Sequence, residues 1–114
     1  MSLTKSDGTI ISEKVEHADT FLGKIVGLMF RKELQGVLIF DMGHNAFDGI
    51  HMLFVRFPID VVFLDHDKNI INIKTNVRPW LGTAFPGAFF RYAIEMPAGT
   101  AEKVALKAGE RLTW

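Results

Sequence analysis

Three residues that could do chemistry, His51, Arg56 and Asp60, lie within one almost uninterrupted apolar stretch, residues 50–65. A buried polar group without a hydrogen-bond partner costs about 1–3 kcal/mol, so we expect each of them to be bonded, paired or functional. If Asp60 holds one imidazole nitrogen of His51, the other nitrogen can act as a base. The stretch therefore marks where a site could lie without naming a reaction.

Whether His51 and Asp60 meet depends on Pro58, which lies between them. In a straight strand the two side chains would face opposite sides of the sheet. Proline cannot donate to the hydrogen-bond ladder, so Pro58 predicts an edge, a bulge or a break. A bulge would turn Asp60 to the face that carries His51. The alternative, which the sequence favours, is a core histidine bonded to the backbone, with Asp60 capping a neighbouring loop.

Two further features could form a binding site. The planar guanidinium of Arg56 suits a carboxylate or a phosphate, although a structural salt bridge is the more common use of such a residue. The loop Arg78–Ala88 contains the breakers Pro79, Gly82, Pro86 and Gly87 and also carries large apolar side chains, including Trp80 and Phe85. Such side chains either seal one end of a β structure or form an exposed patch that marks a partner or ligand surface.

Several kinds of chemistry are not expected. The chain has no cysteine, which excludes disulfides, zinc–thiolate sites, iron–sulfur clusters and thiol catalysis. Asp41, His44, His51 and His66 lack the tight local spacing of zinc ligands, so we predict no metal site. The sequence has no glycine-rich phosphate loop or nucleophile elbow, and we predict no cofactor.

Composition indicates one globular domain. The 114 residues are 48% hydrophobic and 23% charged, which are ordinary values for a folded protein. The formal net charge is zero, so we expect neither nucleic acid nor a membrane as a partner. We see no leader or spanning segment and expect a cytoplasmic protein. Residues 1–8 are polar and are expected to be flexible.

The pattern of elements predicts a mainly β protein. Apolar alternation or short apolar runs predict strands over residues 9–15, 37–40, 50–65, 70–77, 89–96 and 110–114, with Asp65–Asn69 as a hairpin turn. One helix is predicted over Ala18–Arg31 and a short helical turn over Thr100–Leu106, capped by Thr100. In strand 89–96 we place Glu95 opposite the apolar face. These elements favour a jelly-roll-like sandwich or a partly open barrel with one α-helix.

Four motifs occur in order along most of the chain: residues 27–31 (GLMFR), 36–40 (GVLIF), 57–65 (FPIDVVFLD) and 97–100 (PAGT). In these motifs the chain resembles the uncharacterised family called domain of unknown function 192. The resemblance implies a compact, jelly-roll-like β fold and no established activity. Many members carry Trp-Met-Lys-Asn-Thr where this chain has His51–Val55, so a role of that polar trio does not carry over. The resemblance supplies no catalytic residues.

We therefore expect a binding domain rather than an enzyme, with an unknown small molecule or protein as its partner. The site would lie at one end of the sandwich, between the loops Gly43–His51 and Trp80–Phe90. Its lining is expected to be Phe47, His51, Met52, Trp80 and Phe85, with Arg56 or Asp60 supplying polarity. One alternative is a small hydrolase or isomerase that uses His51 and Asp60. Another is a purely structural module that pairs edge strands; the sequence leaves monomer and homodimer open.

Overall fold

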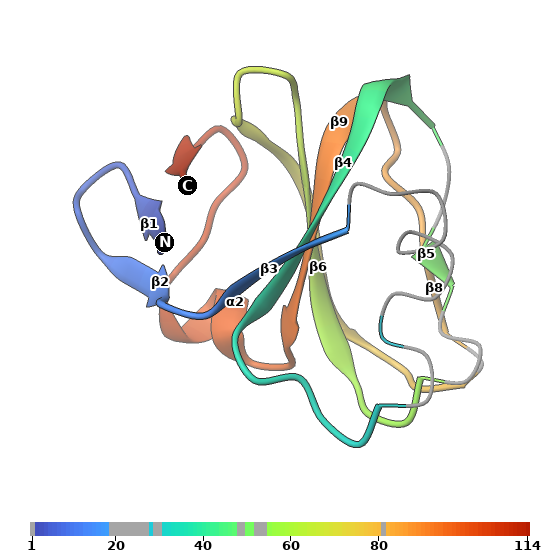
Figure 1. Cartoon of the computed structure of the whole chain (residues 1–114). Helices are drawn as coiled ribbons and strands as arrows, with labels where there is room; N and C mark the ends of the chain where they lie inside the picture. Colours follow the sequence, from blue (N-terminus) through green and yellow to red (C-terminus); the bar gives the residue numbers. More distant parts are fainter. Residues whose placement is uncertain (1, 19–27, 29–30, 48–49, 52–54, 81) are drawn as a thin grey trace.

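A five-stranded sheet forms the centre of the computed structural model (Figure 1). Its strands, in spatial order, are β3 (Val15–Ala18), β4 (Val37–Ala46), β9 (Phe90–Pro97), β6 (Ile59–Leu64) and β7 (Ile70–Val77). β3 and β4 pair in parallel, and the other neighbours are antiparallel. The structure describes residues 2–18, 28, 31–47, 50–51 (backbone only), 55–80 and 82–114.

Two small sheets flank this central one. β1 (Leu3–Lys5) lies between β2 (Ile10–Ser12) and β10 (Leu112–Thr113), and β5 (Ile50–His51) pairs with β8 (Thr83–Ala84). The protein is thus mainly β, as predicted, and its sheets do not close into a barrel. We expected residues 1–8 to be flexible; instead Leu3 is fully buried and its strand pairs on both edges.

Local turn chemistry explains the hairpin between β6 and β7. Asp65 Oδ1 accepts hydrogen bonds from the backbone N–H groups of Asp67 and Asn69, each at 2.9 Å. An aspartate that bonds the backbone two residues later is a common turn former. The turn at Asp65–Asn69 and the strand Ile70–Val77 are confirmed at the residues that the sequence predicts.

The apolar run of residues 50–65 is not one strand, which corrects the simplest form of our expectation. β5 ends at His51, and β6 begins at Ile59, directly after Pro58. β6 starts there because Pro58 has no backbone N–H to donate to the hydrogen-bond ladder. The pairing of β6 with β7 also shifts register between Ile59 and Val61.

Two apolar clusters cover the two faces of the central sheet. One face, here called the terminal face, packs Val62 and Ile94 against the chain ends, including Leu3 and Leu112. The opposite face, here called the loop face, packs Val61 and Ala93 against the connecting segments, including Leu34, Val55 and Ala84. In Figure 1 the chain ends lie to the left of the sheet and the β5–β8 sheet to its right.

The helical expectations have different outcomes. A short helix, α2, runs from Thr100 to Lys103, but its N-cap is Gly99 and no side chain of its own segment caps it. The predicted capping role of Thr100 is therefore wrong, because the helix begins one residue earlier than a threonine cap requires. The helix predicted over residues 18–31 lies almost wholly outside the described residues.

Candidate functional site on the loop face

Asp60 is a structural carboxylate on the terminal face. Its partner across the ladder is Met96, a member of the terminal-face cluster. The fully buried carboxylate accepts three backbone hydrogen bonds, from Asn76 to Oδ1 at 2.8 Å and from Gly99 and Ala101 to Oδ2 at 3.0 Å each. The last two donors belong to the first turn of α2, where a negative charge is favourable. Asp60 thus caps a helix about 40 residues away in sequence, whereas our favoured alternative had it capping a neighbouring loop.

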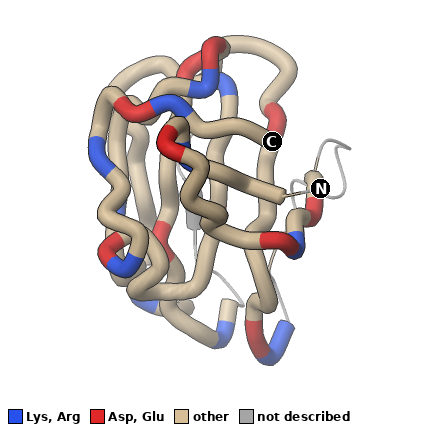
Figure 2. The backbone as a smooth tube through the Cα atoms, turned by 90° about the vertical axis from the view of Figure 1, so that its left-hand side faces the viewer, with Lys and Arg blue, Asp and Glu red and all other residues tan. Residues whose placement is uncertain are grey.

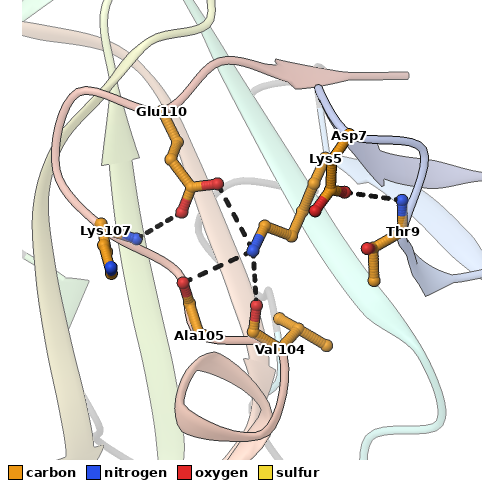
Figure 3. A network of polar contacts seen from close by, with 7 residues as sticks. All are labelled: Lys5, Asp7, Thr9, Val104, Ala105, Lys107 and Glu110. Atoms are coloured by element: carbon orange, nitrogen blue, oxygen red, sulfur yellow. Dashed lines mark hydrogen bonds and ion pairs between the residues drawn. The ribbon is translucent and has the colours of Figure 1, made fainter.

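Lys5 does the corresponding work at the other end of α2 (Figure 3). Its ammonium donates to the carbonyl oxygens of Val104, at 2.7 Å, and Ala105, at 3.5 Å. It also forms an ion pair with Glu110 at 3.4 Å. A cation at a helix C-terminus donates hydrogen bonds to the carbonyls that have no partner within the helix, and it interacts favourably with the helix dipole. The terminal side, which faces the viewer in Figure 2, carries interspersed basic and acidic segments.

The structure does not bring Asp60 and His51 together. His51 lies on β5, in the two-stranded sheet on the loop side, while the Asp60 carboxylate bonds groups on the terminal side. The side chain of His51 and all of Met52 lie outside the described residues. Arg56 is exposed and forms no ion pair within the described ranges, so the salt bridge that we favoured for it is not found there.

Glu95 is the buried acid of the loop face. We placed it opposite the apolar side of its strand, but only 4% of its surface is exposed, because both faces of β9 are covered. No described residue forms a hydrogen bond with its carboxylate. Burial raises the pKa of the Glu95 carboxyl to about 8, and the positive charge of Arg31 opposes this rise by a smaller amount. Glu95 is therefore mostly protonated at neutral pH.

Charged residues share the cross-strand row of Glu95. Leu38 and Val61 flank it directly, and the next residues outward are Glu16 on β3 and Lys74 on β7. At the β3 edge Glu16 pairs with Arg31 at 2.7 Å. Residues in register across a sheet project to the same face, so this row places an acid at the centre of the loop face and a cation at its β7 edge.

The two loops that we expected to form a site do come together. β5 and β8 pair residue Ile50 with Ala84 and His51 with Thr83. The rings of Phe47 and Phe89 meet edge to face, with centroids 5.5 Å apart. Asn72 Nδ2 donates to the Pro86 carbonyl at 3.0 Å, which fixes the second loop to β7.

This part of the molecule exposes most of the large apolar side chains that the described residues leave in solvent. Phe47, Phe85 and Phe89 are 56%, 61% and 67% exposed, and Trp80 is 47% exposed. The only other exposed large apolar residue among those described is Ile10, on β2. Phe47, Phe85 and Phe89 are called the phenylalanine surface below. The Trp80 backbone has a left-handed φ of 65°, and its N–H bonds the Val55 carbonyl at 3.1 Å.

Sequence reasoning missed two functional candidates, Glu95 and Phe89. Phe89 was placed at the start of a strand, but the signal was available, since Phe89 and Phe90 are adjacent and only one of them can face the core. Glu95 carried no local signal. Among the described residues, no group of three histidines or acids is placed to hold a metal ion. In the same ranges, no helix has the length and apolarity needed to cross a bilayer.

Comparison with solved structures supports the fold. A protein of Sinorhizobium meliloti 1021, described as a candidate transcription regulator, superposes with a TM-score of 0.88 at 25% identity, covering 98% of this chain and 89% of that one. A protein of unknown function from Novosphingobium aromaticivorans DSM 12444 superposes with a TM-score of 0.87 at 25% identity, covering 99% and 82%.

Sequence comparison gives the family. A UPF0127 protein of Pyrococcus furiosus is 36% identical over 116 residues, which are 98% of this chain and 96% of the relative. A UPF0127 protein of Pyrococcus abyssi is 34% identical over 118 residues, covering 94% and 97%. The family model DUF192, described as "Uncharacterized ACR, COG1430", matches residues 2–114. The chain therefore belongs to the DUF192 family, whose biochemical function is uncharacterised, as its motifs predicted.

Proposed function

We propose that this protein is a binding domain whose phenylalanine surface takes an apolar segment of another protein. The observation that carries the proposal is the contact between Phe47 and Phe89, two largely exposed rings on loops that the β5–β8 pairing joins. An aromatic side chain buries about 150–250 Å², so the exposed parts of three rings amount to roughly 300–400 Å². Exposed apolar area of this order, with two of the three rings in direct contact, is typical of interaction sites.

The surroundings suit a protein partner. The guanidinium of Arg91, two residues from Phe89, pairs with Asp41 at 2.7 Å, so the charges beside the rings are already matched. A matched polar rim around an apolar centre is the usual anatomy of a protein interface. The contact between the two rings also limits their motion before binding, which lowers the entropy lost on association.

A second copy of the chain and a membrane are less suitable occupants. Lys74 and Arg78 line one pocket with Thr83 of β8, and two copies packed face to face there would bring these like charges together. Membrane docking through exposed rings usually needs a basic cluster around them. Arg91, the cation two residues from Phe89, is already paired with Asp41.

Peptide display on the purified protein tests the proposal. Selected peptides should share closely spaced apolar side chains and should bind with measurable heat in calorimetry. The double variant Phe47→Ser/Phe89→Ser should weaken binding by at least about 2 kcal/mol, or roughly thirtyfold, because it removes both anchor rings. Ile10→Ser, which removes an exposed apolar residue on β2, serves as the matched control and should bind as the parent does.

Three results would overturn the proposal. Selected peptides could bind the double variant as tightly as the parent, or no apolar sequence could be enriched. Sedimentation could reveal a dimer that the double variant abolishes, which would mean that the phenylalanine surface binds a second copy of this chain. Binding to lipid vesicles that depends on the same two rings would give it to a membrane.

A further inference from the structure

We infer that a second, smaller site beside the phenylalanine surface binds a phosphate group. It is a pocket of about 400 Å³ between the end of β7 and β8. Five of its lining residues have a side chain that can donate a hydrogen bond: Lys74, Thr75, Asn76, Arg78 and Thr83. The volume lies within the range of small-molecule pockets.

The charged side chains that the described residues contribute to this pocket are both positive. No acidic residue of the described ranges lines it, and the sequence from Lys68 to Ile94 contains neither aspartate nor glutamate. The Lys74 ammonium and the Arg78 guanidinium form no ion pair or hydrogen bond with any residue in the described ranges. Two neighbouring cations without anions repel each other, so an anion between them is favoured.

Asp60 and Glu102 line a different pocket. Thr75 and Asn76 line both pockets. Three backbone N–H groups already satisfy the Asp60 carboxylate. The acid in the row of Lys74, Glu95, is buried two strands away and mostly protonated at neutral pH.

The loop that forms one wall is tightly built. The Gly82 N–H donates to the Arg78 carbonyl at 3.0 Å, and a Cβ on Gly82 would lie 2.3 Å from that oxygen. Only glycine fits this turn, which holds Arg78 and Thr83 at the same pocket. The Trp80 N–H anchors the turn to the Val55 carbonyl.

The donor set points to phosphate rather than carboxylate. Two cations, two hydroxyls and an amide can surround the three free oxygens of a phosphomonoester, whereas a carboxylate offers only two oxygens. The lining residues come from the end of β7 and from the turn into β8, so a small phosphate group in the pocket lies between these two segments. This inference does not depend on the protein partner proposed above, because that surface uses different side chains.

Amide NMR on the intact ¹⁵N-labelled protein tests the inference. Inorganic phosphate, phenyl phosphate and acetate are titrated separately at neutral pH and constant ionic strength. We expect saturable shifts of the amides of Asn76, Gly82 and Thr83 with phosphate or phenyl phosphate, and weaker effects with acetate. Tighter binding of phenyl phosphate than of phosphate would identify the ligand as an organic phosphomonoester, and equal binding would identify it as free phosphate.

Variants decide whether the shifts report this pocket. Lys74→Gln/Arg78→Gln should lose at least about tenfold in affinity, because each side chain supplies a charged hydrogen bond. Lys32→Gln/Lys103→Gln removes the same charge from exposed positions elsewhere and should bind as the parent does. If the first double variant is misfolded, Thr83→Val, which deletes one hydroxyl, should still weaken binding about threefold to tenfold.

The inference fails on any of three results. Phosphate shifts could grow linearly without saturation, they could persist unchanged in both pocket variants, or acetate could bind as tightly as phosphate.

Discussion

The two faces of the central sheet have similar apolar cores but differ in how their charges are matched. On the terminal face Asp60 and Lys5 close the two ends of α2, and each makes several hydrogen bonds. On the loop face Glu95 is buried without a hydrogen bond from any described residue, and Lys74 and Arg78 line a pocket to which no described acidic residue contributes. On the terminal face these charged groups are used in hydrogen bonds that stabilise the fold. On the loop face the described residues do not provide such partners for Glu95, Lys74 and Arg78.

The two buried acids make the comparison concrete. Asp60 and Glu95 are 0% and 4% exposed, so burial alone does not separate them. Hydrogen bonding separates the two acids. The Asp60 carboxylate accepts hydrogen bonds from three backbone N–H groups. For Glu95, desolvation by burial is the largest effect and raises the pKa of its carboxyl to about 8. The hydrogen-bond donors around a buried acid, rather than its degree of burial, therefore show whether the acid has a structural role.

The largest effect is expected at Asp60. Asp60→Ala should lower the free energy of unfolding by about 3–5 kcal/mol, because it leaves three backbone N–H groups without an acceptor in the interior. Asp60→Asn, which keeps one acceptor oxygen, should lose less. Urea unfolding monitored by circular dichroism measures both. A loss below about 1 kcal/mol for the alanine variant would remove the distinction between the two faces.

The next effect is a pH dependence carried by Glu95. Its pKa is raised on folding from 4.5 to about 8, so the folded state binds more protons than the unfolded state between these values. The free energy of unfolding should therefore fall as pH rises through this window, by up to about 1.4 kcal/mol per pH unit from this group. Urea unfolding at pH 5 and at pH 8 measures the loss.

Glu95→Gln isolates this effect from the other titrating groups. The variant should be more stable than the parent at pH 8 and differ little from it at pH 5, because glutamine stays neutral at both. If the free energy of unfolding of the two proteins changed equally with pH, the ionised Glu95 carboxylate would have to gain a partner. The loop face would then match its charges as the terminal face does.

A smaller effect is expected at Lys5. Lys5→Met keeps most of the apolar stem but removes the ammonium that bonds the Val104 carbonyl, so the free energy of unfolding should fall by about 1–2 kcal/mol. Thermal unfolding compares it with Lys103→Met, an exposed position on α2 that lacks such contacts in the described residues. Equal melting temperatures for the two variants would show that the C-terminal cap does not stabilise α2.

The smallest effect should come from the phenylalanine surface. Phe47→Ser/Phe89→Ser removes one edge-to-face contact between exposed rings, which is worth about 0.5–1.5 kcal/mol beyond area burial. We expect stability within about 1 kcal/mol of the parent, measured by urea unfolding. A much larger loss would mean that these rings belong to the core rather than to a binding surface.

The sequence by itself determined what depends on neighbouring residues. Turn formers at Asp65–Asn69 and clean alternation at Ile70–Val77 fixed a hairpin whose bonds span four residues or fewer. Pro58 predicted an edge, a bulge or a break, and β6 begins directly after it. This could be predicted because the N–H group that proline lacks affects only the hydrogen bonds at its own position. Ordered motifs identified the family. The apolar side chains of the loop Arg78–Ala88 left a sealed end and an exposed patch open, and Trp80 and Phe85 are exposed in the structure.

Only the tertiary structure decided what each charged residue does. The donors to Asp60 lie 16, 39 and 41 residues away, and the burial of Glu95 comes from segments packed on both faces of β9. The pocket beside Lys74 exists because a turn after β7 folds back to meet β8. Solvation and hydrogen bonding are set by whatever comes near in space, and residue order along a chain records that proximity only for close neighbours.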